Sequence, residues 1–280
     1  MKTCGRLVGV PAAGIIVGLF VFSVAGGWGC RQSAVTEPGV PPELAKADGA
    51  RGGGLYDKFW AIAGVEAPKT DHPLWASRPD KGSNKRKGPD TWRCKECHGW
   101  DYKGIEGAYR SGSHKTGFAG IFGTKLSARE VFSLLKEPSG PGEKASGHHY
   151  GSVLGDGDLW DLTKFVLEGQ IVTETMIDGS GKFTGDAPKG AKWYRSGVGT
   201  LAACEKCHGE DGLKVPKGAP ETYSAWVGKM AKANPWEVQH KVRFGQPKTP
   251  MVAWFGTEFS ARDMADLGAF AQTLPTEPAK

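Results

Sequence analysis

The clearest hydrophobic period along the chain occurs twice, in two segments about a hundred residues apart. Apolar residues recur at helical spacing in both segments, at Leu159, Leu162, Phe165 and Val166 and at Met264, Leu267, Phe270 and Ala271. Steps of three and four residues place such side chains on one face of an α-helix, where they can pack into a core. The pattern therefore predicts two core-facing helices of the same kind.

The two segments also align with each other without a gap. YGSVLGDGDLWDLTKFV, starting at Tyr150, lies in register on FGTEFSARDMADLGAFA, starting at Phe255. The register matches Gly151 with Gly256, Asp158 with Asp263, Asp161 with Asp266, Leu162 with Leu267 and Phe165 with Phe270. In the second segment, Ser260 followed three residues later by Asp263 is typical of a capped helix start. We interpret the pair as an internal repeat.

Earlier parts of the chain extend this repeat. SAREVFSLLKEP (127–138) and NPWEVQHKVRFG (234–245) each open with a polar residue that favours a helix start. GGGLYDKFW and GAKWYRSGV place glycine and aromatic residues where a first helix would begin in each repeat. The 42 glycines and 18 prolines favour short helices separated by long loops.

We therefore expect an all-α protein with two domains, residues 51–184 and 185–280. The joint is expected near residues 180–190, at DGSGKFTGDAPKG.

The N-terminal 30 residues have the pattern of an export signal. Lys2 and Arg6 precede an uncharged apolar stretch over residues 7–25, which predicts a secretory leader and a periplasmic protein. Cys30 stands where a lipoprotein signal would place its acylated cysteine, so membrane anchoring through a lipid, simple cleavage and an uncleaved anchor all remain open. Residues 31–50 are rich in Pro, Ala, Gly and charge and are expected to form a flexible tether.

The cysteines carry the strongest chemical signal. Cys4 and Cys30 lie in the leader region, and the remaining four lie in two C-x-x-C-H motifs, formed by Cys94, Cys97 and His98 and by Cys204, Cys207 and His208. A zinc ribbon would require two neighbouring knuckles, and a thioredoxin-type dithiol would require a βαβ setting. The histidine that follows each pair at once is typical of c-type haem attachment instead. The sequence therefore predicts two covalently bound haem c groups.

With these motifs, the chain resembles dihaem c-type cytochromes built from two tandem class I cytochrome c domains, over about everything after the tether. The resemblance implies, for each domain, a few short helices around a covalent haem, with long loops. It also implies a histidine ligand from each motif, His98 and His208, and a distal ligand from the loop before the last helix. In the second repeat this loop reads PKTPMVAWFG, which indicates Met251. Met264, Met230 and His240 are weaker rivals.

The first repeat departs from that pattern, since no methionine occurs between His98 and Met176. Imidazole is also a good ligand for haem iron, and ASGHHYGS stands in the corresponding loop. We expect His148 to be the distal ligand, with His149 and the more distant Met176 as alternatives. His114 and His72 are weaker candidates, and a five-coordinate first haem is a further alternative.

These ligands indicate an exported electron carrier or relay between respiratory redox partners. A thioether favours ferrous iron where a second imidazole does not, so the first haem is expected at the lower potential and electrons to run toward the second. Two fully ligated irons leave no substrate position, and the sequence assigns no catalytic residue. The alternative is a dihaem oxidoreductase, peroxidase-like or sulfur-compound-oxidising, whose first haem opens. A third possibility is a haem subunit docked on a larger membrane complex.

Charge refines the expected partners only slightly. The formal net charge is +6, from 36 basic against 30 acidic residues. Between Tyr56 and Cys94 lies a long insertion that the second repeat lacks. Its dense basic stretch, RPDKGSNKRKG (78–88), could dock an acidic redox protein, or could be a solvated loop. Nucleic acid is not expected as a partner, because the export signal and the haem motifs argue against it.

Overall fold

The computed structural model describes residues 39–137, 148–197, 199, 202–216 and 226–279. The predicted leader, with Cys30, lies outside the described residues. Within the described part the chain is helical and forms no β-strand, only two isolated bridges, which confirms the all-α prediction. No described helix is both long enough and apolar enough to cross a membrane.

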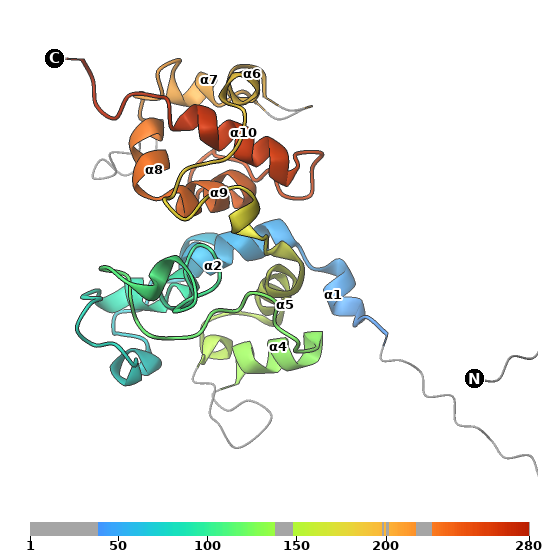
Figure 1. Ribbon diagram of the computed structural model, residues 1–280. Helices are drawn as coiled ribbons and strands as arrows, with labels where there is room; N and C mark the ends of the chain where they lie inside the picture. Colours follow the sequence, from blue (N-terminus) through green and yellow to red (C-terminus); the bar gives the residue numbers. More distant parts are fainter. Residues whose placement is uncertain (1–38, 138–147, 198, 200–201, 217–225, 280) are drawn as a thin grey trace, which may run out of the picture. The chain divides into compact units, whose positions relative to one another are not determined.

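The helices follow one another as Figure 1 shows. The α-helices are α1 (Pro42–Lys46), α2 (Gly49–Ala63), α3 (Cys94–His98), α4 (Ala128–Lys136), α5 (Asp156–Lys164), α6 (Ala187–Ser196), α7 (Glu205–His208), α8 (Val227–Ala233), α9 (Pro235–Phe244) and α10 (Ala261–Ala271). Single turns of 3₁₀ helix are η1 (Pro73–Ser77), η2 (Gly88–Trp92), η3 (Ala108–Arg110), η4 (Tyr150–Ser152) and η6 (Thr173–Thr175), and η5 (Phe165–Gly169) is a π-helical turn.

In the first half of the described chain, α2 packs closely against α5. The Asp48 carboxylate caps α2 by accepting from the backbone N–H groups of its first turn. The Asp48 N–H in turn donates to Asp161 Oδ1 on α5 at 2.7 Å. Gly52 lets the two backbones touch, because a Cβ there would lie 2.0 Å from the Asp161 carbonyl oxygen.

The second half repeats this crossing with α6 and α10. The Asp186 N–H donates to Asp266 Oδ1 at 2.6 Å, and a Cβ on Gly190 would lie 1.9 Å from the Asp266 carbonyl oxygen. Asp161 and Asp266 thus have the same role, as the sequence register predicted. The predicted match of Phe165 with Phe270 is also confirmed, since each is buried in the core of its half.

The predicted helix starts are confirmed as well. The side chains of Ser127, Asn234 and Ser260 each accept from the backbone N–H three residues later, at the starts of α4, α9 and α10. Ser127 and Ser260 form complete capping boxes with Glu130 and Asp263.

Two hydrophobic clusters form the core. The first is built on Leu55, Tyr56, Phe59, Leu159, Leu162 and Phe165, and the second on Met176, Ile177, Phe183, Tyr194, Met264 and Leu267. The two-domain division itself stays a prediction. Met176, Ile177 and Phe183, before the predicted boundary at residue 185, already pack in the second cluster. The reason is the bridge between Ile177 and Phe183, which folds this glycine-containing stretch back on itself.

The two clusters belong to one compact unit, Val40–Lys280. Helix α9 makes most of the polar contacts between the halves. His240 on α9 is fully buried, with Nδ1 3.0 Å from the Tyr102 hydroxyl and Nε2 3.0 Å from the Gly53 carbonyl oxygen. Gln239 donates to the Trp100 carbonyl oxygen at 2.9 Å. The halves are therefore joined through a buried polar interface rather than a free linker.

The stretch predicted as a tether, residues 31–50, needs correction at its C-terminal end. Helix α1 lies within it, with Leu44 buried, and Asp48 and Gly49 begin the contacts of α2 with the core. The apolar period was missed because α1 is only one turn and offers a single buried side chain. Residues 31–38 lie outside the described part of the chain.

Candidate cofactor-binding sites

Both C-x-x-C-H motifs fold into the same short helix. Helix α3 holds the first motif, and Cys204 is the residue before α7, which holds the rest of the second. Each helix ends at a glycine with positive φ, 80° at Gly99 and 78° at Gly209. The four cysteines are free thiols, so within the described chain neither pair forms a disulfide. Burial raises the pKa of Cys94 and Cys204 to about 11.

A tyrosine from the preceding helix holds each motif in place. The Tyr56 hydroxyl donates to the Gly99 carbonyl oxygen at 2.6 Å, and the Tyr194 hydroxyl donates to that of Gly209, also at 2.6 Å. The first of these hydrogen bonds is buried and the second partly buried. The two motifs are thus fixed to their own halves in the same way.

His98 is oriented by the loop that follows its motif. Its Nδ1 lies 2.7 Å from the Ala119 carbonyl oxygen, and the His98 carbonyl oxygen accepts from the Gly104 N–H at 2.8 Å. A carbonyl can only accept, so Nδ1 carries the proton and Nε2 keeps its lone pair. Metal-binding histidines are commonly held in this way by a backbone carbonyl. His98 is therefore prepared to coordinate through Nε2.

His148 lies opposite His98. The two ring centres are 6.1 Å apart, and the ring planes differ by 23°. An imidazole nitrogen lies about 2 Å from a metal that it binds, so two imidazoles on opposite sides of one metal have nitrogens about 4 Å apart and ring centres somewhat farther apart. Burial, and then the neighbouring His98, lower the pKa of His148 to about 3, which keeps it neutral and able to coordinate.

His149 is placed differently. Its backbone is left-handed, with φ 55°, and its side chain lines a surface pocket with Lys136 and Ser152. Among the described residues only His148 of the two has a ring contact with His98. The structure thus brings the predicted residue, rather than its neighbour, to the motif.

The other candidate histidines have different partners. His72 Nδ1 accepts from the Leu74 N–H, and its Nε2 lies 3.2 Å from the His148 carbonyl oxygen. The His114 ring stacks on Tyr109, with Nδ1 3.4 Å from a Glu96 carboxylate oxygen. Neither ring has a contact with His98 among those described. His240, as described above, uses both nitrogens within the interface between the halves.

At the second motif the described contacts are fewer. Cys204 and Met251 both pack against the second hydrophobic cluster, and Met251 lies in the loop between α9 and α10, as predicted. His208 Nδ1 is buried and has no hydrogen-bond partner in the described part of the chain. A buried polar atom of this kind calls for a partner. No described contact joins Met251 to His208, so Met251 as a ligand stays a prediction.

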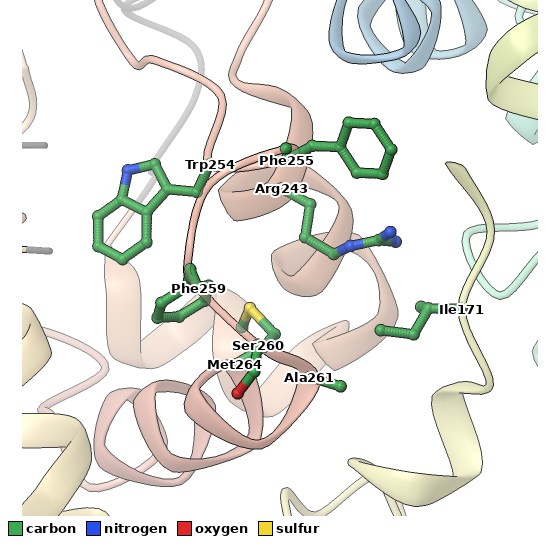
Figure 2. Close-up of a pocket in the computed structure, with 9 residues that line it drawn as sticks. Ile171, Arg243, Trp254, Phe255, Phe259, Ser260, Ala261 and Met264 are labelled. Carbon is green, nitrogen blue, oxygen red and sulfur yellow. The ribbon is translucent and has the colours of Figure 1, made fainter. Parts of the chain in front are cut away.

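Met176 and Met264 are core residues, whereas Met230, on α8, is only partly buried. Met176 is fully buried in the second cluster, so it does not lie in the first half, where the alternative ligand role would need it. Met264 lies on the buried face of α10, and Figure 2 shows its sulfur near Phe259 at the wall of a small pocket. Arg243 and Trp254 also line this pocket, and no residue of either C-x-x-C-H motif does.

Sequence reasoning missed a buried charge cluster beside the first motif. Asp57 on α2 pairs with Arg93, directly before the motif, and with Lys241 on α9. Burial alone would raise the pKa of Asp57, but Lys241 and Arg93 outweigh it and hold that pKa well below its usual range. Inside the motif, buried Glu96 pairs with Lys95 at 2.5 Å and with Arg86 at 3.1 Å.

The same contacts show how the predicted basic loop is attached. Arg86 reaches inward to Glu96, and Asn84, fully buried, donates to Glu96 at 2.8 Å. Lys81, Lys85 and Lys87 remain exposed. The loop is therefore anchored beside the first motif and only partly solvated. No local pattern could have shown this, because the anchoring carboxylate lies inside the C-x-x-C-H motif itself.

Within the described residues, no three or more His, Cys, Asp and Glu side chains are arranged to hold a metal ion by themselves. Comparison with models of known protein families found no match, and comparison with curated proteins found none either.

Proposed function

We propose that the protein is an exported dihaem cytochrome c that carries or relays electrons between redox protein partners. The observation that carries the proposal is the pair of C-x-x-C-H motifs at equivalent places of two repeated helical frames, the first facing a second imidazole across 6.1 Å. The proposal includes two tandem class I cytochrome c domains, a fold that the repeated helix crossings support.

The residues present fit two haem groups. Cys94 and Cys97 would attach the first, with His98 and His148 holding its iron. Cys204, Cys207, His208 and Met251 would hold the second in the same order. The protonated Nδ1 of His98, held by the Ala119 carbonyl oxygen, is the state expected of an imidazole whose other nitrogen binds a metal. When bound, haem supplies the one-electron couple of its iron.

The chain's own residues favour a relay over a catalyst. His148 is buried opposite His98, so it would close the position that a substrate would otherwise use. The second ligand would be a nitrogen at the first site and a sulfur at the second. The first haem would then have the lower reduction potential. Electrons would then run from the first half to the second, across the interface that α9 makes.

The first test is low-temperature EPR of the oxidised, haem-loaded protein and of the variants His148→Ala and Met251→Ala. Two low-spin signals are expected, one lost in each variant, with His149→Ala as the matched control that keeps both. Mass spectrometry should show two haems on the chain. A high-spin first haem in the unmutated protein would overturn the relay and point to the oxidoreductase alternative, to be tested with peroxide and sulfur compounds.

A further inference from the structure

The first half carries a long segment that the second half lacks. Residues 65–93, between α2 and the first motif, form a folded insertion with the two 3₁₀ turns η1 and η2. In the second half only a short connection separates α6 from Cys204. The insertion buries His72, Trp75, Asn84, Thr91 and Trp92, so it packs on the first half at these points while Lys81, Lys85 and Lys87 stay exposed.

His72 links this insertion to the segment that holds His148. Its Nδ1 accepts from the Leu74 N–H at 3.1 Å, which leaves the proton on Nε2. Nε2 therefore donates to the His148 carbonyl oxygen, 3.2 Å away. His72 is itself fixed, because its backbone N–H donates to Thr91 Oγ1 at 2.8 Å. The hydrogen bond thus runs from a rigid donor to the backbone of His148.

A second link lies two residues further on. The Tyr150 hydroxyl donates to the Trp92 carbonyl oxygen at 2.7 Å. The His72 ring packs edge to face on Trp92, with centres 4.5 Å apart, and lies 5.8 Å from Tyr150. Residues 148–150 are therefore held by the insertion through two hydrogen bonds and an aromatic cluster.

The backbone of this segment needs such support. His149 has φ 55°, a left-handed conformation that costs free energy in a residue other than glycine and persists only where its surroundings hold it. Its own side chain makes no ring contact with the cluster among the described residues. The support comes from its two neighbours, His148 through its carbonyl oxygen and Tyr150 through its hydroxyl.

We propose that His72 is a positioning residue, and that the insertion is a clamp that keeps the His148 ring opposite His98. The inference rests on the proposed function, in which His148 is an axial ligand of the first haem. It gives a reason why the insertion occurs only in the half whose candidate distal ligand is a histidine. Losing the donor should let the His148 segment move away from the first motif.

The test uses the complete haem-loaded protein with His72→Phe, which keeps an aromatic ring and removes the donor. Carbon monoxide is the probe, since it binds ferrous haem only where the sixth ligand has left. We expect carbon monoxide to bind the first haem about tenfold faster in the variant, the effect typical of one lost hydrogen bond. EPR of the oxidised variant should show a new high-spin fraction from the first haem alone.

Three variants control the interpretation. His72→Gln retains an N–H donor and should restore slow binding. Ser77→Ala removes another hydrogen-bond donor of the same insertion, whose acceptor is the Leu74 carbonyl oxygen rather than a residue of the His148 segment, and should behave as the unmutated protein. Thr91→Val removes the acceptor that fixes His72 and should give a smaller effect in the same direction, which decides the question if His72→Phe does not fold.

The outcomes separate this inference from the function on which it rests. If His148→Ala removes a low-spin signal but His72→Phe and Thr91→Val leave both EPR and carbon monoxide binding unchanged, the clamp is wrong and the relay stands. An equal effect of Ser77→Ala would also refute it. If His148→Ala changes nothing, the ligand assignment fails, and the clamp fails with it.

Discussion

The two halves share a frame in which corresponding residues make corresponding contacts. Asp48 caps α2 and Asp186 caps α6. Gly52 and Gly190 lie at the helix crossings, and a tyrosine holds each motif. They differ in what surrounds that frame. The first half adds the insertion and His148, whereas the second half contributes α9, most of which is buried between the halves.

This difference separates two kinds of constraint. The shared contacts lie where two helices of one half cross or where a motif meets its own first helix, so each half must satisfy them independently. The unshared contacts lie at the edge of a motif or between halves, where each half has a different neighbour. Helix α4 shows the contrast, because it matches α9 in sequence yet buries only Val131 and Leu135.

The most direct way to break the shared frame is to substitute its crossing glycines. Gly52→Ala and Gly190→Ala would each place a methyl group about 2 Å from a backbone carbonyl oxygen, which cannot rotate away. We expect each to lower the free energy of unfolding by about 3 kcal/mol or more, because the helices must separate. Gly157→Ala, on α5 with open space around it, is the control and should be neutral or slightly stabilising. Chemical denaturation measures all three, and a mild Gly52→Ala would mean that α2 and α5 cross less closely.

Substituting Asp57 tests a contact that only the first half has. Asp57→Asn would leave Arg93 and Lys241 without their shared carboxylate, and removing one partner of a buried ion pair typically costs about 3–5 kcal/mol. The register of Tyr56 on Tyr194 matches Asp57 with Arg195, which is exposed. Arg195→Gln should therefore change the free energy of unfolding by about 0.5 kcal/mol or less. Similar losses from the two substitutions would contradict the asymmetry.

Acid gives an independent measure of the same cluster. The folded-state pKa of Asp57 is held below its unfolded value of about 3.9, so its stabilisation is present above that pH and is lost as pH falls toward the folded pKa. We expect the urea midpoint of the unmutated protein to fall between about pH 5 and pH 3, as the unfolded chain takes up protons first. Asp57→Asn should show a shallower fall over this range, and an unchanged slope would remove Asp57 as its source.

Much of the frame could be predicted from the sequence, because its signals are local. Helical periodicity placed α5 and α10, the polar residues Ser127, Asn234 and Ser260 marked helix starts, and the gapless register found the repeat. At the first motif, the missing methionine pointed to His148 and His149, and the register with Met251 favoured His148; the structure places the His148 ring beside His98, while its role as a ligand stays a prediction. The sequence therefore predicted each helix and each motif separately.

The contacts between distant elements could not be predicted in the same way. Lys241 and Asp57 are separated by 184 positions, and nothing in either segment marks the other as a partner. His72 was judged a weak ligand candidate, and its hydrogen bond to the backbone of His148 depends on how the insertion folds. Every residue has a backbone carbonyl oxygen, so the sequence does not mark which residue accepts such a hydrogen bond. Such pairings become visible only once the helices have been placed.

The smallest expected effect compares the two tyrosines that hold the motifs. Tyr56→Phe and Tyr194→Phe each remove one hydrogen bond of 2.6 Å to a glycine carbonyl oxygen, and each glycine keeps a longer backbone donor, from Tyr102 and Gly212. The bond at Gly99 is buried and the one at Gly209 partly buried, so water can replace the lost hydroxyl only at the second. We expect a loss of about 2 kcal/mol for Tyr56→Phe and about 1 kcal/mol or less for Tyr194→Phe, as measured by urea denaturation. Equal losses, or a larger one at Tyr194, would show that the motifs are held alike and that the halves differ only in what surrounds them.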